Sequence, residues 1–322
     1  MIRKKPRTST LAIGVDLGAT TVKTGVVSSA GKILYQNKFP TNGELGPRAV
    51  FKQIQSSVHD ALLHAKGKKI TGIGIGSPGV VDDDGVVKSP PNLKDWTEVP
   101  LRKEIQKLFK STKVLVENDA NAAAIAESKF GAGRKFPNFL FVIWGTGVGG
   151  GIILDNKIYR GPTGGAGEVG HISIDHNGPP CNCGSRGCVE AYIGQRYLSQ
   201  RTAERLKTSP DSRILQLVGG NPSRIEPVFI AQAAHDGDRL AREILVEAGT
   251  LLGVALAAVM NTMDLRISII GGGISAAGDF VLQAVKDSIV AHVLQHLRND
   301  IQVFQATLGN NAGILGAAGL VL

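Results

Sequence analysis

The chain has 322 residues, which is enough for one large domain or two ordinary ones. Apolar residues make up 43% of it and charged residues 20%, a composition that excludes a disordered chain and is typical of a globular one. The net charge is +9, and the +5 that remains without the four basic residues of the N-terminal tail suits an anionic substrate. Only 5% of the residues are aromatic and they do not alternate with basic ones, so we expect no nucleic-acid groove.

The first part of the chain alternates predicted strands and helices. Apolar runs predict strands at 11–15, 32–39, 70–75 and 114–116 and another that ends at Val27. The spacing of apolar residues and the capping residues predict helices at 48–66, 101–109 and 119–130. Strands that alternate with helices indicate a mainly parallel sheet with helices on both faces.

The second part of the chain restarts the pattern of the first. Strands predicted at 138–143 and 152–154 flank a Gly/Thr loop, which repeats the strand–loop–strand arrangement of the N-terminus about 130 residues later and indicates an internal duplication. A long functional loop at 160–188, long helices at 192–217 and 236–260, a strand at 267–270 and a small-residue helix at 312–322 complete the prediction. The fold class is therefore α/β, with two such units facing one another across a cleft.

The sequence gives no sign of membrane insertion or export. The longest apolar run, 248–260, is shorter than the roughly 20 residues of a spanning helix, and Asp16 ends the apolar stretch after the basic N-terminus too early for a signal peptide. We therefore expect a cytoplasmic protein whose basic tail (Arg3, Lys4, Lys5 and Arg7) is a solvated terminus.

Glycine is enriched to 41 residues, and because most of the excess is clustered we expect it to serve specific loops. Three clusters suit phosphate, namely Asp16–Thr20, Gly145–Gly151 and Gly271–Gly273, because glycine lets backbone N–H groups approach an anion and an aspartate can hold Mg²⁺ through water. For each cluster taken alone, the alternative to phosphate binding is a turn with a purely structural role. Neither a Walker nor a Rossmann glycine pattern follows the first strand, which disfavours those nucleotide folds.

Asp119 is the carboxylate of greatest interest. It stands where a predicted strand meets an alanine-rich helix, a position from which catalytic residues project into clefts. It is a candidate base for phosphoryl transfer, and an N-cap of the helix is the alternative; the two roles are compatible.

All three cysteines lie within eight residues, and a histidine precedes them. His171, Cys181, Cys183 and Cys188 form the donor set of a closed tetrahedral zinc site, while three buried thiols beside a surface histidine are the alternative. Four protein ligands leave no open position, so such a zinc would be structural. It would clamp the loop that carries Glu168 and Glu190.

Six motifs, taken in order, resemble the ROK group (repressors, open reading frames and sugar kinases) of the actin-like ATPase superfamily. They are Asp16-Leu-Gly-Ala-Thr, Gly74-Ile-Gly-Ser-Pro-Gly-Val, Asn118-Asp-Ala-Asn-Ala, Gly145-Thr-Gly-Val-Gly, Glu168-Val-Gly-His and Cys181-x-Cys-Gly-x-x-Gly-Cys-x-Glu. The resemblance implies two actin-like (ribonuclease H-like) α/β domains. The small one would cover 1–118 with the helix 312–322 packed back on it, and the large one 119–311 with the zinc loop.

The resemblance also implies roles for single residues. Asp119 is the expected general base, and His171 is expected to serve both zinc and sugar, one ring nitrogen to each. The expected sugar contacts are Gly79, Asn92, Asn118, Asp119, Glu168, His171 and Glu190, and the expected nucleotide-side residues are Asp16, Gly18, Thr20, Lys23, Thr146, Gly147, Gly271 and Gly272.

The activity so implied is transfer of phosphate from ATP to a hexose, in first place to the 6-hydroxyl of glucose, with Mg²⁺ and structural Zn²⁺ as cofactors. The alternative substrates are N-acetylmannosamine, N-acetylglucosamine, fructose, mannose and allose. A sugar-responsive transcriptional regulator of the same family needs a helix-turn-helix module before the first strand, where only ten residues stand, so we expect a kinase. The expected partners are the sugar, ATP and further copies of the chain in a dimer or tetramer, and neither nucleic acid nor a membrane.

Overall fold

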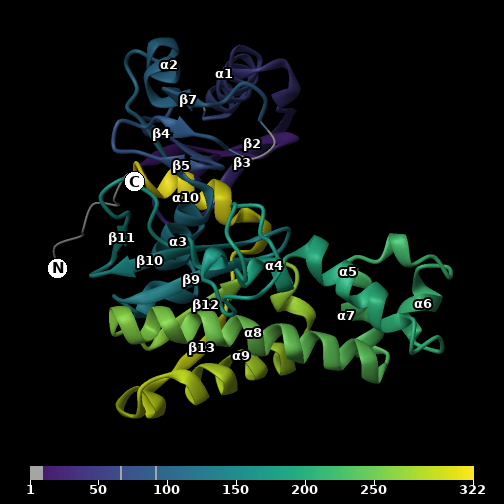
Figure 1. The fold of residues 1–322 in the computed structure, drawn as a ribbon. Coiled ribbons are helices and arrows are strands. Elements are labelled where there is room, and N and C mark those ends of the chain that lie inside the picture. The colour runs from purple at the N-terminus through teal and green to yellow at the C-terminus, as the bar shows by residue number, and fades with distance from the viewer. Residues whose placement is uncertain (1–9, 66, 91–92) are drawn as a thin grey trace, which may run out of the picture. The chain divides into compact units, whose positions relative to one another are not determined.

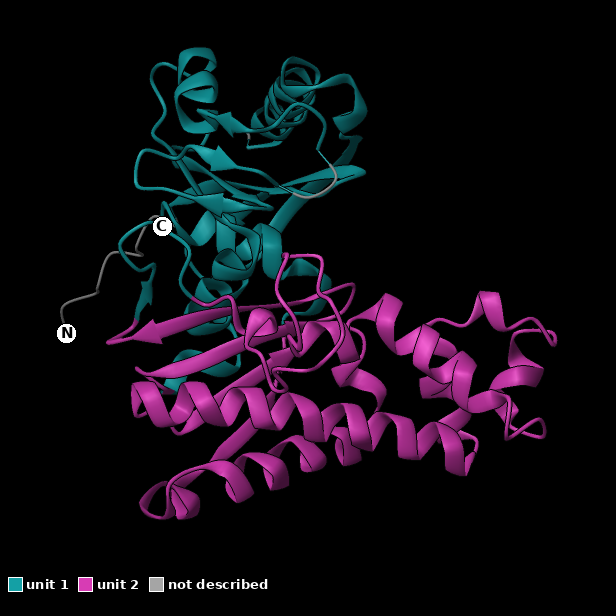
Figure 2. Cartoon of the chain, in the orientation of Figure 1, with its two compact units in different colours: residues 1–135, 157–166, 308–322 teal, residues 136–156, 167–307 magenta. Residues whose placement is uncertain are grey.

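Figure 1 shows a computed structural model of the chain, which describes residues 10–65, 67–90 and 93–322. The chain divides into two compact units, coloured separately in Figure 2. Unit 1 contains the residues up to 135 together with 157–166 and 308–322, and unit 2 contains 136–156 and 167–307. Each unit has its own sheet and its own hydrophobic core. The basic tail and Asn92 lie outside the described residues.

The sheet of unit 1 has five strands in the order β3-β2-β1-β4-β8. Their bounds are β1 (Leu11–Leu17), β2 (Thr21–Ser28), β3 (Ile33–Pro40), β4 (Ile70–Ser77) and β8 (Val114–Asn118). The first three form an antiparallel meander, and β4 and β8 run parallel to β1. The unit also holds β5 (Val80–Val81), β6 (Val87–Lys88), β7 (Glu98–Val99), β11 (Lys157–Tyr159), α1 (Pro47–His64), α2 (Leu101–Leu108), α3 (Asp119–Phe130) and α10 (Ala312–Gly319), with short 3₁₀ turns η1 (Gly43–Leu45), η2 (Ala132–Lys135) and η7 (Gly309–Asn311).

Helices cover both faces of this sheet, as the sequence predicts. Along β1, Ile13 and Val15 pack in the core that α1 and α2 close, whereas Ala12 packs with residues of α3 and α10 on the opposite face. This alternation is the period of two that a strand buried on both faces requires.

The face covered by α10 is built on glycine. A Cβ on Gly14 of β1 would lie 2.0 Å from the carbonyl oxygen of Ile314, and one on Gly74 of β4 would lie 1.7 Å from that of Ala317. A Cβ on Gly316 would lie 1.8 Å from the carbonyl oxygen of Ala122 in α3. The sheet, α10 and α3 therefore meet backbone to backbone, which is why α3 belongs to unit 1 together with the C-terminal helix.

The sheet of unit 2 repeats that of unit 1. Its strands β10 (Val148–Leu154), β9 (Phe139–Trp144), β12 (Ile267–Gly271) and β13 (Gln302–Gln305) follow one another in the sheet as β2, β1, β4 and β8 do in unit 1. The pair β9–β10 is antiparallel, and β12 and β13 run parallel to β9. The shared order confirms the duplication that the two hairpins predict.

The helices of unit 2 are α4 (Glu190–Ile193), α5 (Gln195–Leu206), α6 (Arg213–Leu217), α7 (Pro227–His235), α8 (Arg239–Met263) and α9 (Asp279–His292), with 3₁₀ turns η3 (Val169–His171), η4 (Pro222–Arg224), η5 (Ser275–Ala277) and η6 (Gln295–Asp300). The single long helix predicted at 192–217 is wrong, because Gly194 is extended between α4 and α5 and the turns around Pro210 separate α5 from α6. The helix predicted at 236–260 is confirmed as α8.

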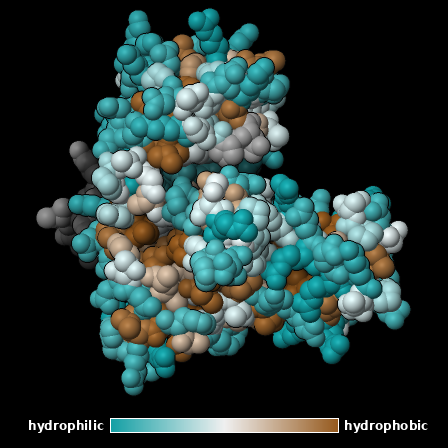
Figure 3. Space-filling model, in the orientation of Figure 1, coloured by the Kyte–Doolittle hydropathy of each residue, from teal (hydrophilic) through white to brown (hydrophobic). Residues whose placement is uncertain are grey.

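Among the described residues, α8 is the one helix long and apolar enough to cross a membrane, and 56% of its apolar window is buried inside the protein. Its buried side includes Leu245, Leu252, Leu256 and Met260, all within the core of unit 2, so it has the burial of a core helix. The face of the molecule drawn in Figure 3 is mostly hydrophilic, with hydrophobic residues scattered over it.

Candidate functional site

Asp119 is the first residue of α3, directly after β8 ends at Asn118. The helix is capped by Asn118, whose Oδ1 accepts a hydrogen bond from the backbone N–H of Asn121 at 3.0 Å. The N-cap alternative for Asp119 is therefore wrong. The exposed Asp119 carboxylate accepts the N–H of Ala120 at 2.8 Å, at the helix N-terminus where the peptide dipoles favour a negative charge.

The side chain of Asn118 also ties α3 to the loop after β4. Its Nδ2 donates to the carbonyl oxygen of Gly79 at 3.0 Å. Gly79 has φ of +87°, and a Cβ there would lie 2.8 Å from the carbonyl oxygen of Lys88, so the position requires glycine. Three expected sugar contacts, Gly79, Asn118 and Asp119, thus lie together in unit 1.

The glycine loop of unit 1 is the tight turn between β1 and β2. Gly18 N–H donates to Thr21 O at 3.0 Å, and Thr20 at the turn is exposed. The Asp16 carboxylate lies 3.2 Å from the ammonium group of Lys23, and a Cβ on Gly313 at the start of α10 would lie 2.6 Å from its Cγ. Asp16 is therefore held by an ion pair and packs closely against the backbone of Gly313.

The matching loop of unit 2 contacts Glu190. Glu190 Oε2 accepts the N–H of Val148 at 2.8 Å, and a Cβ on Gly147 would lie 2.5 Å from the same oxygen. The loop that follows β12 packs beside it, since Gly272 has φ of +94° and a Cβ there would lie 2.1 Å from the carbonyl oxygen of Trp144. In unit 2, the expected nucleotide-side residue Gly147 thus lies against one expected sugar contact, Glu190, and Gly272 lies against the end of β9.

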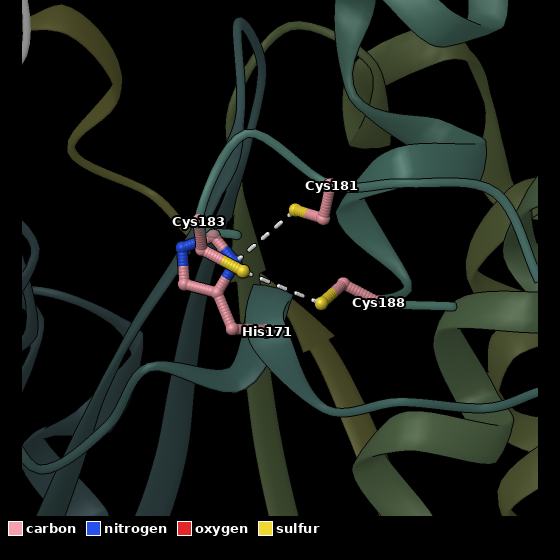
Figure 4. A group of neighbouring side chains, drawn as sticks. All are labelled: His171, Cys181, Cys183 and Cys188. Carbon is pink, nitrogen blue, oxygen red and sulfur yellow. Dashed lines mark hydrogen bonds between the residues drawn. The ribbon is translucent and has the colours of Figure 1, made fainter. Parts of the chain in front are cut away.

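The four predicted zinc ligands lie together in unit 2, as Figure 4 shows. The ligand atoms of His171, Cys181, Cys183 and Cys188 are all within 4.8 Å of one another. Cys183 Sγ lies 3.6 Å from Cys188 Sγ, and His171 Nδ1 lies 3.6 Å from Cys181 Sγ. A tetrahedral zinc with Zn–S bonds of about 2.3 Å separates its sulfur ligands by about 3.8 Å, so the donor set has the spacing of such a site.

The cluster is also one that a cation would stabilise. Burial, together with the neighbouring thiols, raises the pKa of Cys188 to about 12, and burial raises the pKa of Cys181. A backbone hydrogen bond from Ser185 lowers the pKa of the exposed Cys183, whereas the two buried thiols would become thiolates if a metal supplied the compensating charge. His171 Nδ1 faces the sulfurs, so Nε2 is the nitrogen available to a second partner. Glu168 is exposed immediately before η3, the turn that carries His171.

Two residues near Asp119 were not among the sequence candidates. Glu117 is buried at the end of β8, and its carboxylate lies 3.1 Å from Nε of Arg160. The signal in the sequence is a glutamate within the apolar strand 114–118, but its partner is more than forty residues away and could not be identified from spacing.

A duplicated sheet whose hairpins carry glycine-rich loops is the architecture of the actin-like α/β proteins. The family model described as "ROK family" matches residues 12–322, so the chain belongs to the ROK family.

Relatives in this family include both kinases and regulators. A glucokinase of Streptomyces coelicolor is 38% identical over 314 residues, covering 96% of this chain and 97% of the relative. A xylose repressor of Caldicellulosiruptor bescii is 32% identical over 315 residues, covering 96% of this chain and 77% of the repressor. Among solved structures, a ROK family glucokinase from Streptomyces griseus in complex with glucose and AMPPNP superposes with a TM-score of 0.83 at 37% identity, covering 97% of this chain and 99% of that one.

Proposed function

We propose that this protein is an ATP-dependent hexose kinase and that glucose is its substrate, phosphorylated at the 6-hydroxyl. The observation that carries the proposal is the similarity to glucokinases along almost the whole length of both chains. The residues present support the proposal, since the chain has a carboxylate at the start of α3, three glycine-rich loops and polar side chains of the kind that bind sugar hydroxyls.

Asp119 is the proposed general base. It would accept the proton as the O–H bond of the sugar hydroxyl breaks, while the sugar oxygen bonds to the γ-phosphorus and the bond from that phosphorus to the bridging oxygen of ADP breaks. Its position at a helix N-terminus favours the ionised form that a base requires. A carboxylate is basic enough because the loose transition state of phosphoryl transfer demands little proton removal early.

The sugar would contact Gly79, Asn118, Asp119, Glu168, His171 and Glu190, and carboxylates are suitable acceptors for sugar hydroxyls. The backbone N–H groups of the loops around Gly18, Gly147 and Gly272 would bind the phosphates. Asp16 would hold Mg²⁺, whose role is to neutralise the charge of the β- and γ-phosphates.

Zinc is the proposed ion of the cluster at His171. With four protein ligands it would have no open coordination position, so its role would be to fix the loop between His171 and Glu190. His171 would bind the metal through Nδ1, the nitrogen that faces the sulfurs, and would leave Nε2 for a sugar hydroxyl. We also expect the protein to form a dimer or tetramer, which light scattering will measure.

A coupled assay with ATP and Mg²⁺ over glucose, mannose, fructose, allose, N-acetylglucosamine and N-acetylmannosamine tests the substrate. We expect the highest kcat/KM with glucose, and a higher value for any other sugar would reassign the specificity. Asp119→Asn should retain the fold and glucose affinity while kcat falls by about 100- to 10,000-fold, the range of general acid–base contributions. A variant that keeps most of the kcat would remove Asp119 from the mechanism.

The similarity to a xylose repressor supports one other function, a sugar-responsive regulator of transcription. The same assay separates the two functions. The regulator would be favoured if calorimetry detects binding of a sugar while the assay detects no phosphate transfer to any of the six sugars.

A further inference from the structure

Arg160 holds together segments that are distant in the sequence. It lies in the 157–166 segment of unit 1, and its guanidinium donates to the carbonyl oxygens of Val81 and Asp82, each at 3.1 Å, and to the Asp83 carboxylate at 2.8 Å. Its remaining nitrogen, Nε, lies 3.1 Å from Glu117 Oε2. A planar guanidinium with five N–H groups can serve several acceptors at once, which a lysine ammonium does not reproduce.

Glu117 connects this arginine to the expected sugar contacts. Its other oxygen, Oε1, accepts the backbone N–H of Asn118 at 2.9 Å and the side-chain amide of Asn121 at 3.1 Å. Asn118 in turn caps α3 and donates to Gly79. Only 3% of the surface of Glu117 is exposed, so its charge is compensated by these partners and not by water.

Backbone packing at Gly164 also holds the segment 157–166 against residues 81–82. Gly164, in the segment of Arg160, has φ of +83°, and a Cβ there would lie 2.0 Å from the carbonyl oxygen of Val81. The segment 157–166 is thus fixed to residues 81–82 both by the guanidinium and by a contact between backbones. An exposed ion pair would contribute little, whereas here Glu117 is buried and the terminal nitrogens of Arg160 are held by three hydrogen bonds to residues 81–83.

We propose that Arg160 and Glu117 are positioning residues for phosphoryl transfer, which hold Asn118, Asp119 and Gly79 in the geometry that the sugar requires. The inference deepens the proposed function and rests on it. Neither side chain needs to touch the sugar or the nucleotide, because Glu117 acts through the backbone of Asn118 and Arg160 acts through Glu117.

The principal test compares Glu117→Gln with Arg160→Met and Arg160→Lys in the full chain. Since a misplacement of about 1 Å can cost about 100-fold in rate, we expect kcat to fall about 10- to 100-fold in the first two variants while KM for ATP changes less than about twofold. Arg160→Lys should recover only part of the loss. The matched controls are Asp83→Asn, which removes only the 88% exposed partner of Arg160, and Arg213→Met, which removes an exposed ion pair in unit 2; both should keep wild-type kinetics.

The pH dependence provides a readout that a merely structural role would not change. Burial raises the pKa of Glu117, the charge of Asp83 adds to the rise, and Arg160, Asn121 and the N–H of Asn118 oppose it. Without Arg160 the carboxyl will take up a proton at higher pH, so the acidic limb of the kcat profile of Arg160→Met should move to higher pH. The double variant Arg160→Met/Glu117→Gln should lack that displacement, because no carboxyl remains to titrate.

The outcomes separate this inference from the proposed function. If the wild type phosphorylates no sugar, the proposed function fails, and hydrogen exchange at the amides of Asn118–Asn121 still tests the positioning through its loss of protection in Arg160→Met. If the wild type is active and Arg160→Met and Glu117→Gln keep its kcat and pH profile, the inference is overturned, even where both variants melt at lower temperature. A lower kcat with the displaced acidic limb supports it.

Discussion

Replacing Gly316 with alanine tests whether α10 holds α3 in place. The new Cβ would lie 1.8 Å from the carbonyl oxygen and 2.3 Å from the carbonyl carbon of Ala122, whereas real Cβ atoms essentially never approach another heavy atom closer than 3.0 Å. The obstacle is backbone inside a helix, so one helix must move by more than 1 Å. Overpacking of this kind costs about 3 kcal/mol or more, and the better helix propensity of alanine returns about 1 kcal/mol. We therefore expect a loss of at least about 2 kcal/mol.

Gly319→Ala is the matched control, because it makes the same change in the same helix. Its Cβ would meet only side-chain atoms, the nearest being Cγ2 of Ile125 at 3.1 Å, which can yield. Urea unfolding followed by the fluorescence of the two buried tryptophans, Trp96 in unit 1 and Trp144 in unit 2, measures the free energy, and hydrogen exchange in α3 assigns the loss to unit 1. If both glycine variants unfold within about 1 kcal/mol of the wild type, the backbone packing of α10 on α3 does not stabilise the unit.

Two further substitutions address the sites directly. Gly313→Ala should displace the Asp16 carboxylate, from whose Cγ the new Cβ would lie 2.6 Å, and should lower kcat/KM for ATP by about tenfold or more in the coupled assay; an unchanged value would exclude Asp16 from the nucleotide site. Cys183→Ser should reduce zinc content to well below one per chain by mass spectrometry and weaken glucose binding, since the loop between His171 and Glu190 would lose its clamp. If the metal-free variant keeps its full affinity for glucose, zinc does not support the sugar site.

The parts of the fold with local causes were predictable from the sequence. The hairpin β1–β2 and its counterpart β9–β10 each carry apolar runs on both sides of a glycine loop, and the shared pattern was enough to predict the duplicated sheet. The cluster proposed to bind zinc could also be predicted from the sequence, because three of its four residues stand within eight positions. The break between α5 and α6 was missed because the apolar spacing continues through it while Pro210 ends the hydrogen bonding. The strand β13, with the four residues Gln302–Gln305, is too short for periodicity to identify.

The contacts of the candidate site join residues that are far apart in the sequence, and for this reason they could not be predicted from the sequence alone. The expectation that the glycine excess serves loops is only partly right, since Gly14 and Gly74 lie in strands and Gly316 in a helix. Gly14 needs to be glycine because residue 314 lies against it, three hundred positions along the chain. Glu117 is acceptable in a buried strand for the same kind of reason, because Arg160 arrives from another segment to compensate its charge. In both cases the residue type is explained only by its partner, so the sequence can mark the position as unusual and the structure must supply the reason.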